Sequence, residues 1–399
     1  MKELFPSFKN NKDMVYLDSA ASALKPMCVI DAIDDYYMNY STNIDRGVYR
    51  QSLEATKKCE ESREAIARFI NANNNEIIFT RGASNSLNMV ASMLGSVLED
   101  GDEVITSELE HHSSFLPWLN ISKHKNIKLR FIPLTKEGKI TVENFKSVLT
   151  NKVKVVQITH VSNVLGYKSP IEEIIKLAHK KGAIVSIDGA QAIPHMKVDV
   201  KDLDVDFYSF SLHKMCGPTG LGVLYGKYEL LNKLDPVELG GEMNDEVTTS
   251  SVTYKEVPHK FETGTLPIAE IFAVKPCVEF LESIGINKIE KIGIDLRNKA
   301  LDELNKMDDI EVYNAIENSP IIAFNIKGVH SHDAVSYLAE NGIAIRAGHH
   351  CAEPLHRFLN LSATLRASFY FYNDEKDVKE FIDAIKKSIE FFKEVGYIG

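Results

Sequence analysis

Apolar and polar residues alternate in blocks along this chain, and the blocks predict its regular structure. Between residues 75 and 225, β-branched and aromatic residues gather in short runs, which favours strands over residues 76–80, 103–106, 128–132, 154–159, 183–187 and 207–210. Helical periodicity fills several of the intervals, most clearly over residues 171–181, where Gly182 marks the stop. Short apolar strands that alternate with helices predict an α/β fold with a mostly parallel central sheet covered on both faces.

A second α/β pattern occupies the C-terminal part of the chain. Residues 258–264 are typical of a crossing between domains, and a long helical stretch runs from about residue 267 into the 280s. Strands are expected over residues 321–326 and 343–346, a helix over 332–341, and a closing helix from residue 375. We therefore predict a large domain over residues 16–260 and a smaller α/β domain built from residues 1–15 and 261–399.

Composition supports two domains and narrows the class of function. The chain has 399 residues, 44% of them hydrophobic, which exceeds the roughly 250–300 residues at which single cores usually split. Its net charge is −10 and no cluster of Lys or Arg stands out, so we expect no nucleic-acid partner. No apolar run approaches the roughly 18 residues of a membrane span, and the first residues have no signal-peptide core.

The five cysteines are far apart and form no Cys-x-x-Cys, so a disulfide framework is not expected. These features favour a cytoplasmic enzyme, with small polar substrates and protein partners both open. One cysteine, Cys351, has neighbours that a buried core residue does not need. Arg346, His349 and His350 are potential cations, and nearby cations favour the reactive thiolate. The alternatives are a buried structural cysteine or one ligand of a metal site.

Lys214 follows an apolar strand in a turn rich in glycine and small polar residues. Ser211 and His213 are donors on alternate positions beside it, and Gly217 and Gly220 let backbone approach a bound group. This setting suits a lysine that forms a Schiff base beside a phosphate; the alternative is an ordinary surface lysine.

Asp188 ends another apolar strand, where a carboxylate is unfavourable unless it is paired. Pyridoxal phosphate needs a carboxylate on its ring nitrogen, which keeps the ring an electron sink. Asp188 and Lys214, at adjacent strand ends, could hold the two sides of such a ring. The alternative is an aspartate that caps a turn together with an unrelated lysine.

A phosphate site could lie where residues 80–88 follow a strand and open a helix. Gly82, Ala83 and Ser84 could present N–H groups and a hydroxyl to a phosphate at the helix N-terminus, although Ser84 could also be a simple N-cap. His111 or His112 could supply an aromatic plate for the ring. A zinc site at Glu110–His112 is disfavoured, because a metal needs three or four ligands.

Six segments together carry a resemblance that extends over nearly the whole chain. They are Tyr16-Leu-Asp-Ser-Ala-Ala-Ser22, His160-Val-Ser-Asn-Val-Leu-Gly166, Asp188-Gly-Ala-Gln191, Ser211-Leu-His-Lys-Met-Cys-Gly-Pro-Thr-Gly220, Phe261-Glu-Thr-Gly-Thr265 and Arg346-Ala-Gly-His-His-Cys-Ala-Glu-Pro-Leu355. With these segments the chain resembles the SUF-type cysteine desulfurases (SufS-like, group II of the NifS-like proteins) of the class V aminotransferase family. The resemblance implies the type I fold of pyridoxal-phosphate-dependent transferases and pyridoxal 5'-phosphate as cofactor.

The resemblance also implies residue roles. Lys214 would hold the cofactor and later move protons, Asp188 would pair with the pyridinium nitrogen, and His111 would stack on the ring. Gln191 would bond the ring oxygen. The implied phosphate contacts are Ala83, Ser84, Ser211 and His213, together with Thr265 from the other protomer. The implied substrate contacts are Arg366 to the carboxylate, Asn163 to the carboxylate and the cofactor, and Arg346 as a substrate-binding residue that lines the same pocket. A bidentate clamp by Arg366 suits a carboxylate.

The reaction that the resemblance implies takes sulfur from L-cysteine, leaving L-alanine and a persulfide on Cys351. A homodimer with shared active sites is implied, in which Asp45 stands where many relatives carry histidine. The sulfur would pass to an acceptor protein of the SUF system for iron–sulfur cluster assembly. His332 matches a histidine thought to bind the zinc of a scaffold-like acceptor; the alternative is an ordinary histidine at a helix N-terminus.

Other functions fit parts of the same pattern. A selenocysteine lyase or cysteine-sulfinate desulfinase would use the same lysine and carboxylate clamp, and steady-state rates on the three substrates would separate them. An aminotransferase would not need Cys351. A sulfur-relay protein with a degenerate site is disfavoured because Lys214, Asp188 and Arg366 are all present.

Overall fold

The computed structural model describes residues 1–316 and 318–398, so Glu317 and Gly399 of the expected small domain lie outside the described residues. The strands are β1 Val15–Tyr16, β2 Ile77–Thr80, β3 Glu103–Thr106, β4 Lys128–Phe131, β5 Val153–Thr159, β6 Ile184–Asp188, β7 Phe207–Ser211, β8 Gly222–Gly226, β9 Asn244–Val247, β10 Val252–Tyr254, β11 Ile310–Val312, β12 Ile321–Ile326, β13 Ile343–Ala344, β14 Arg346–Gly348 and β15 Thr364–Ser368.

The α-helices cover these strands and connect them. They are α1 Pro6–Asn10, α2 Met27–Asp35, α3 Arg50–Ile70, α4 Ala83–Val97, α5 His112–His124, α6 Val142–Val148, α7 Ile171–His179, α8 Tyr228–Lys233, α9 Ile268–Phe272, α10 Val274–Ile284, α11 Ile286–Leu304, α12 Ser331–Glu340, α13 Glu353–Phe358 and α14 Glu375–Glu394. Within the described residues, none of the helices has the length and apolar character that crossing a membrane requires.

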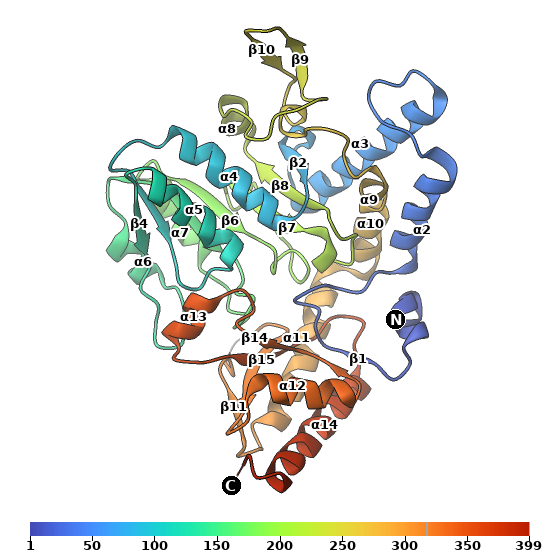
Figure 1. Ribbon diagram of the computed structural model, residues 1–399, viewed down its shortest axis with the longest axis vertical. Helices are drawn as coiled ribbons and strands as arrows, with labels where there is room; N and C mark the ends of the chain where they lie inside the picture. The colour runs from blue at the N-terminus through green and yellow to red at the C-terminus, as the bar shows by residue number, and fades with distance from the viewer. Residues whose placement is uncertain (317, 399) are drawn as a thin grey trace.

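The largest sheet among the described residues has seven strands in the order β2-β8-β7-β6-β5-β3-β4. The pairs from β4 through β7 are parallel, whereas β8 runs antiparallel to both β7 and β2. Strands β5 to β8 are almost entirely buried, as expected for a sheet with helices on both faces. This arrangement confirms the predicted α/β fold with a mostly parallel sheet (Figure 1).

A second, four-stranded sheet has the order β11-β12-β15-β14, and all its pairs are antiparallel. Its apolar side chains form a separate core with α11, α12 and α14, to which Val15 and Leu17 contribute. The chain start reaches this core because β1 pairs with β13, and Asp18 then bridges to Ser368 beside β15. Figure 1 shows this unit below the large sheet.

The elements expected from the sequence are mostly present, with three differences. The strand expected over residues 343–346 is two short strands, because β13 pairs with β1 whereas β14 pairs with β15. Strand β8 is an addition to the predicted strands of the large sheet. The helical stretch from residue 267 is divided into α9, α10 and α11, and Gly285 separates the last two with a φ of 91°.

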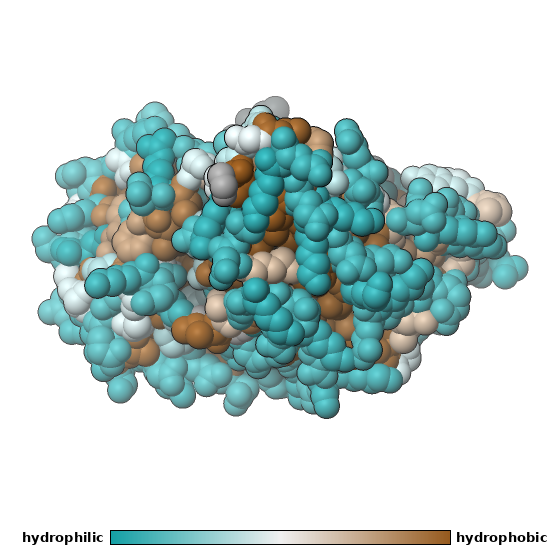
Figure 2. Space-filling view, turned by 90° about the horizontal axis from the view of Figure 1, so that it is seen from below, coloured by the Kyte–Doolittle hydropathy of each residue, from teal (hydrophilic) through white to brown (hydrophobic). Residues whose placement is uncertain are grey.

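The boundary between the two expected domains stays a prediction. Helices α9 and α10 contribute Ile271, Cys277 and Leu281 to the core of the large sheet. We propose on this ground that the boundary lies after α10 rather than at residue 260. Figure 2 looks onto the far end of the smaller unit, which is mostly hydrophilic with apolar surface visible between polar side chains.

Candidate active site

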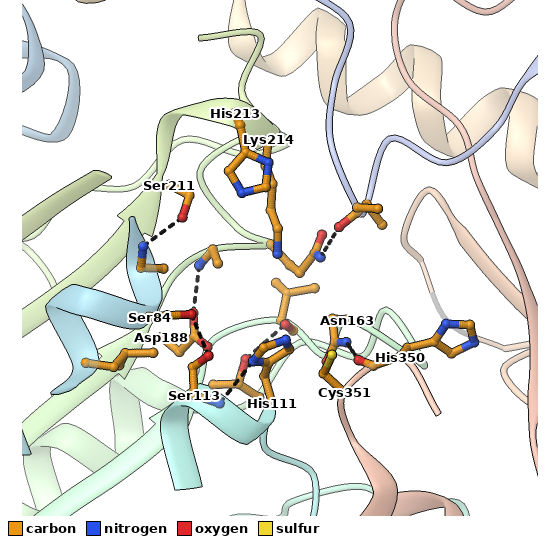
Figure 3. Close-up of a pocket in the computed structure, with 18 of the residues that line it drawn as sticks. Ser84, His111, Ser113, Asn163, Asp188, Ser211, His213, Lys214, His350 and Cys351 are labelled. Carbon is orange, nitrogen blue, oxygen red and sulfur yellow. Dashed lines mark hydrogen bonds between the residues drawn. The ribbon is translucent and has the colours of Figure 1, made fainter. Parts of the chain in front are cut away.

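The candidate residues meet in one cavity of about 270 Å³ at the carboxyl ends of the central strands. Strand β6 ends at Asp188 and β7 ends at Ser211, so the topology alone brings these side chains to one edge of the sheet. Figure 3 shows Lys214 reaching into the cavity, Ser84 and Ser211 on one side of it, and Cys351 at the other. Ala83, His111, Asn163, Gln191, His213, Arg346 and Arg366 complete the predicted set in the same lining.

Burial shifts the pKa of both Lys214 and Asp188 toward their neutral forms. Burial lowers the pKa of Lys214 to about 8, so a useful fraction of its amine is neutral and nucleophilic near neutral pH. Burial also raises the pKa of Asp188, whose carboxylate accepts a hydrogen bond from the backbone N–H of Ala190 at 3.0 Å. A cation on the cavity side of Asp188 would stabilise its ionised form, which is what a protonated ring nitrogen supplies.

The start of α4 forms the polar end of the cavity. The backbone N–H of Ala83 donates to Ser211 Oγ at 2.7 Å, and the hydroxyls of Ser84 and Ser113 lie 2.6 Å apart. Gly82, with a φ of 139°, precedes the helix. Gly222 of β8 lets the two backbones approach, because a Cβ on Gly222 would lie 2.4 Å from the Gly82 Cα. Backbone N–H groups and hydroxyls at a helix N-terminus suit a phosphate.

The ring-binding positions also fit pyridoxal phosphate. His111 caps α5 by accepting the Ser113 N–H on Nδ1, which fixes its ring, and burial lowers its pKa to about 4. Gln191 donates from Nε2 to the Ala20 carbonyl at 2.7 Å, while its buried Oε1 has no partner among the described residues. A lysine, a buried carboxylate, a fixed imidazole and a free amide oxygen around one cavity match the groups of this cofactor.

Cys351 lies in a four-residue connection between β14 and α13, and its side chain is exposed. The backbone oxygen of Cys351 accepts the His112 N–H at 2.7 Å, and Asn163 Nδ2 donates to the His350 carbonyl at 2.6 Å. His350 and Cys351 both have a left-handed backbone, with φ of 50° and 56°. Residues of the large sheet's unit therefore hold this loop on both sides of its cysteine.

One part of the expected thiol environment is wrong. His350 turns its ring away from Cys351 (Figure 3) and places Nε2 against Thr364, 3.0 Å from Oγ1. Burial lowers the pKa of His350 to about 2, so it is neutral and cannot act as a cation for the thiolate. The left-handed backbone at His350 accounts for the direction of its ring.

Asp18 is a site residue that sequence reasoning missed, although it lies inside one of the quoted segments. Its carboxylate accepts two N–H groups of Arg346, Nε at 3.2 Å and Nη2 at 2.9 Å. Its Oδ1 lies 3.4 Å from Nη2 of Arg366. Arg366 is buried, donates from Nη1 to the Asn163 carbonyl at 2.7 Å, and has an Nε without a partner among the described residues.

Two predicted residues lie outside the cavity. Thr265 is exposed and lines a different hollow with Asp45 and Glu242. His332 is exposed at the start of α12, and a Cβ added to Gly348 of β14 would lie 3.9 Å from its Nε2. Neither residue is among those that line the cavity with Lys214.

Glu110 is fully buried behind His111 and accepts hydrogen bonds from Ser107 and Ser114, each at 2.8 Å. Burial raises its pKa to about 8, so it is mostly protonated at neutral pH. Within residues 1–316 and 318–398, no group of three or more His, Cys, Asp and Glu side chains is placed to hold a metal.

Known proteins match the chain over almost its whole length. The Aminotransferase class-V family matches residues 15–381. A probable cysteine desulfurase of Halalkalibacterium halodurans is 46% identical over 400 aligned positions, covering 99% of this chain and 98% of the relative. A probable cysteine desulfurase of Staphylococcus aureus is 45% identical over 387 positions, covering 96% of this chain and 94% of the relative.

Two solved structures are similar over nearly their full length. The cysteine desulfurase CsdA from Escherichia coli has a TM-score of 0.92 and 37% identity, with 98% of each chain covered. The apo cysteine desulfurase from Thermococcus onnurineus has a TM-score of 0.94 and 36% identity, covering 98% of this chain and 97% of the other.

Proposed function

The chain belongs to the class V aminotransferase family, as a pyridoxal-phosphate-dependent enzyme of the cysteine desulfurase type, and we propose that it moves sulfur from L-cysteine onto Cys351. In the balanced reaction, L-cysteine and the Cys351 thiol give L-alanine and a Cys351 persulfide. The observation that carries the proposal is the convergence of Lys214, Asp188 and Cys351 on one cavity. Bound pyridoxal phosphate would supply an electron sink conjugated to the substrate nitrogen.

The residues of the chain divide the remaining work. Lys214, with its lowered pKa, can both attach to a carbonyl carbon and carry protons at the substrate Cα. Asp188 would hold the ring nitrogen protonated, and His111 would lie on the ring face. Arg366 would bind the substrate carboxylate through its free Nε and the adjacent Nη2.

Cys351 would attack the sulfur of the bound substrate as its C–S bond breaks. The electron pair of that bond is left with the organic fragment, which takes up a proton and departs as alanine, while a new S–S bond remains on the enzyme. The loop around Cys351 is held by His112 and Asn163, so the thiol reacts from a fixed position.

Mass spectrometry of the protein after addition of L-cysteine tests this proposal. We expect one added sulfur on Cys351, and none on a Cys351→Ser variant that keeps the visible absorbance of the Lys214-bound cofactor. Cys28→Ser is the matched control, because Cys28 lies outside the cavity lining, and it should gain the sulfur normally. Alanine production at the wild-type rate by Cys351→Ser would contradict the persulfide route.

We further propose that the persulfide passes to an acceptor protein of the SUF system, in the cytoplasm, from a homodimer. Cys351 is exposed in a short loop. Because such a loop cannot carry the persulfide far, we expect the acceptor protein to bind next to it. Thr265 would reach the phosphate of the partner protomer, which its position outside its own cavity permits.

His332, beside β14, would then meet a zinc-bound acceptor. His332→Ala should slow transfer to such an acceptor while leaving alanine formation in the presence of a small thiol unchanged. Equal slowing of both reactions would instead assign His332 a structural role in α12.

A further inference from the structure

The two chain neighbours of Cys351, His350 and Ala352, are both tied to Thr364 at the start of β15. Nε2 of His350 lies 3.0 Å from the Thr364 hydroxyl and 3.1 Å from the Thr364 carbonyl oxygen. On the other side, the Ala352 carbonyl lies 3.0 Å from Nδ1 of His356, whose Nε2 lies 3.0 Å from the same hydroxyl. Thr364 and both histidines are buried, so these bonds are shielded from bulk water.

The partners in this hydrogen-bonded chain determine where each proton lies. A carbonyl oxygen only accepts, so Nδ1 of His356 carries the proton of that ring and its Nε2 accepts one from the Thr364 hydroxyl. Nε2 of His350 faces the Thr364 carbonyl, so it carries a proton and donates to the carbonyl and the hydroxyl. The Nδ1 of His350 is then bare, which agrees with its lack of a partner among the described residues. All the bonds run in one direction and strengthen one another.

The turn that these bonds hold is not one that its backbone favours. His350 and Cys351 both have a left-handed φ, of 50° and 56°, a region that residues with a side chain enter only at an energetic cost. Contacts from outside must therefore keep the turn in place. His112 and Asn163 hold it from the unit of the large sheet, and Thr364 holds it from β15.

We propose that Thr364 is a positioning residue of this reaction: its hydroxyl joins His350 to His356 and so holds the Cys351 thiol where the substrate sulfur will lie. The inference rests on the proposed function, because it concerns the attack of the same thiol. Thr364 is not among the residues that line the cavity, so it acts through the two histidines. Misplacing a reacting group by about 1 Å can slow its reaction on the order of a hundredfold.

Strand β15 then contributes to both ends of the substrate site. Thr364 and Arg366 are two residues apart, so their side chains leave the strand on the same face. On the proposed function, Arg366 binds the carboxylate of the substrate, whereas Cys351 attacks its sulfur. One strand therefore sets the distance between the group that holds the substrate and the group that reacts with it.

Two reactions of the same thiol separate its position from its chemical reactivity. Persulfide formation in a single turnover of the holoenzyme with L-cysteine needs the thiol in a fixed place. Alkylation of Cys351 by iodoacetamide, followed by mass spectrometry, needs only an exposed thiol. Thr364→Val keeps the shape of the side chain and removes the hydroxyl, so it should slow persulfide formation about tenfold to a hundredfold and change the rate of alkylation less than about twofold.

Three further variants control for packing and folding. Thr364→Ser keeps the hydroxyl and should form the persulfide at near the wild-type rate. Thr106→Val is the matched control, because it removes a buried strand hydroxyl that has no partner among the described residues, and it should leave both reactions unchanged. His356→Asn keeps a donor near the Ala352 carbonyl but no group that reaches Thr364, so it should show the same selective loss even if Thr364→Val folds poorly.

A binding measurement completes the test. Titration of the cofactor absorbance with L-alanine should give the same dissociation constant for Thr364→Val as for the wild type. Weaker binding that matches the slower sulfur transfer would place the effect at Arg366, and equal slowing of alkylation would place it in the reactivity of the thiol; either result overturns the inference, as does an unchanged rate of persulfide formation. A wild-type protein that forms no persulfide on Cys351 refutes the proposed function itself.

Discussion

The buried ion pair between Arg63 and Glu262 gives the sharpest test of how this structure is stabilised. Arg63 lies on α3 with 3% of its side chain exposed, and Glu262 has 2% exposed. The two guanidinium nitrogens meet the two carboxylate oxygens at 2.7 and 2.9 Å. Two further bonds run to β2, from Arg63 to the Ile77 carbonyl and from the Phe79 N–H to Glu262, and Arg63 Nε also pairs with Glu60 at 3.1 Å.

Arg63→Met removes the guanidinium and leaves the Glu262 carboxylate buried, with the Phe79 N–H as a hydrogen-bond donor and His259 Nδ1 3.8 Å away. Breaking a buried pair in this way costs about 3–5 kcal/mol of unfolding free energy. Arg68→Met on the same helix removes an exposed pair with Glu282, 2.9 Å long, and should cost less than about 1 kcal/mol. Equilibrium unfolding in urea, followed by the fluorescence of the single tryptophan, Trp118, measures both.

A double variant distinguishes the loss of the ion pair from the cost of leaving the Glu262 carboxylate buried and unpaired. Adding Glu262→Gln to Arg63→Met removes the unpaired carboxylate and keeps an acceptor for the Phe79 N–H, so most of the lost stability should return. If Arg63→Met costs no more than Arg68→Met, burial does not set the strength of this pair and the reasoning fails.

Three further predictions concern pH and the cofactor. A hydrogen bond from His179 to Asp206 raises the pKa of His179 in the folded protein. The stability that this bond contributes is therefore complete below the pKa of His179 in the unfolded chain and is lost as pH rises through the folded pKa. His179→Gln should lower the melting temperature at acidic but not at alkaline pH. Burial raises the pKa of Glu110 to about 8 in the folded protein, against 4.5 for an ordinary glutamate. Between these two values the unfolded chain loses the Glu110 proton and the folded protein keeps it, so the free energy of unfolding falls as pH rises. Glu110→Gln should therefore gain stability over wild type across that window. Gly222→Ala would push a Cβ against Gly82, and equilibrium dialysis should show weaker binding of pyridoxal phosphate; unchanged affinity would mean that the start of α4 moves freely.

The sequence predicted that Asp188, Ser211 and Lys214 lie close together, and the reason is physical. Asp188, Ser211 and Lys214 each follow an apolar strand, and parallel strands place their carboxyl ends at one edge. Strand β8 was harder to see, because Gly222 and Gly226 flank only three apolar residues. Its place in the sheet comes from pairing with β2, which is remote in sequence.

The substrate end of the cavity depends on contacts that no local pattern contains. Asp18 meets Arg346 across 328 residues and Arg366 across 348 residues. His350 shows a different limit of sequence reasoning. The sequence places it next to Cys351, but it does not show which way the His350 ring points. A left-handed backbone at His350 sends the ring toward Thr364, and only the folded loop reveals that turn.

The pairing of β1 with β13 has a consequence for how the protein is made. Lys214 and Asp188 are complete once the central strands have left the ribosome, whereas Asp18 waits for β15 and its Arg366. On the proposed roles, a nascent chain halted between these points would have Lys214, which would hold the cofactor, but not Arg366, which would bind the substrate carboxylate. We therefore expect the cofactor site to be encoded before the substrate site, which forms only when the two ends of the chain meet.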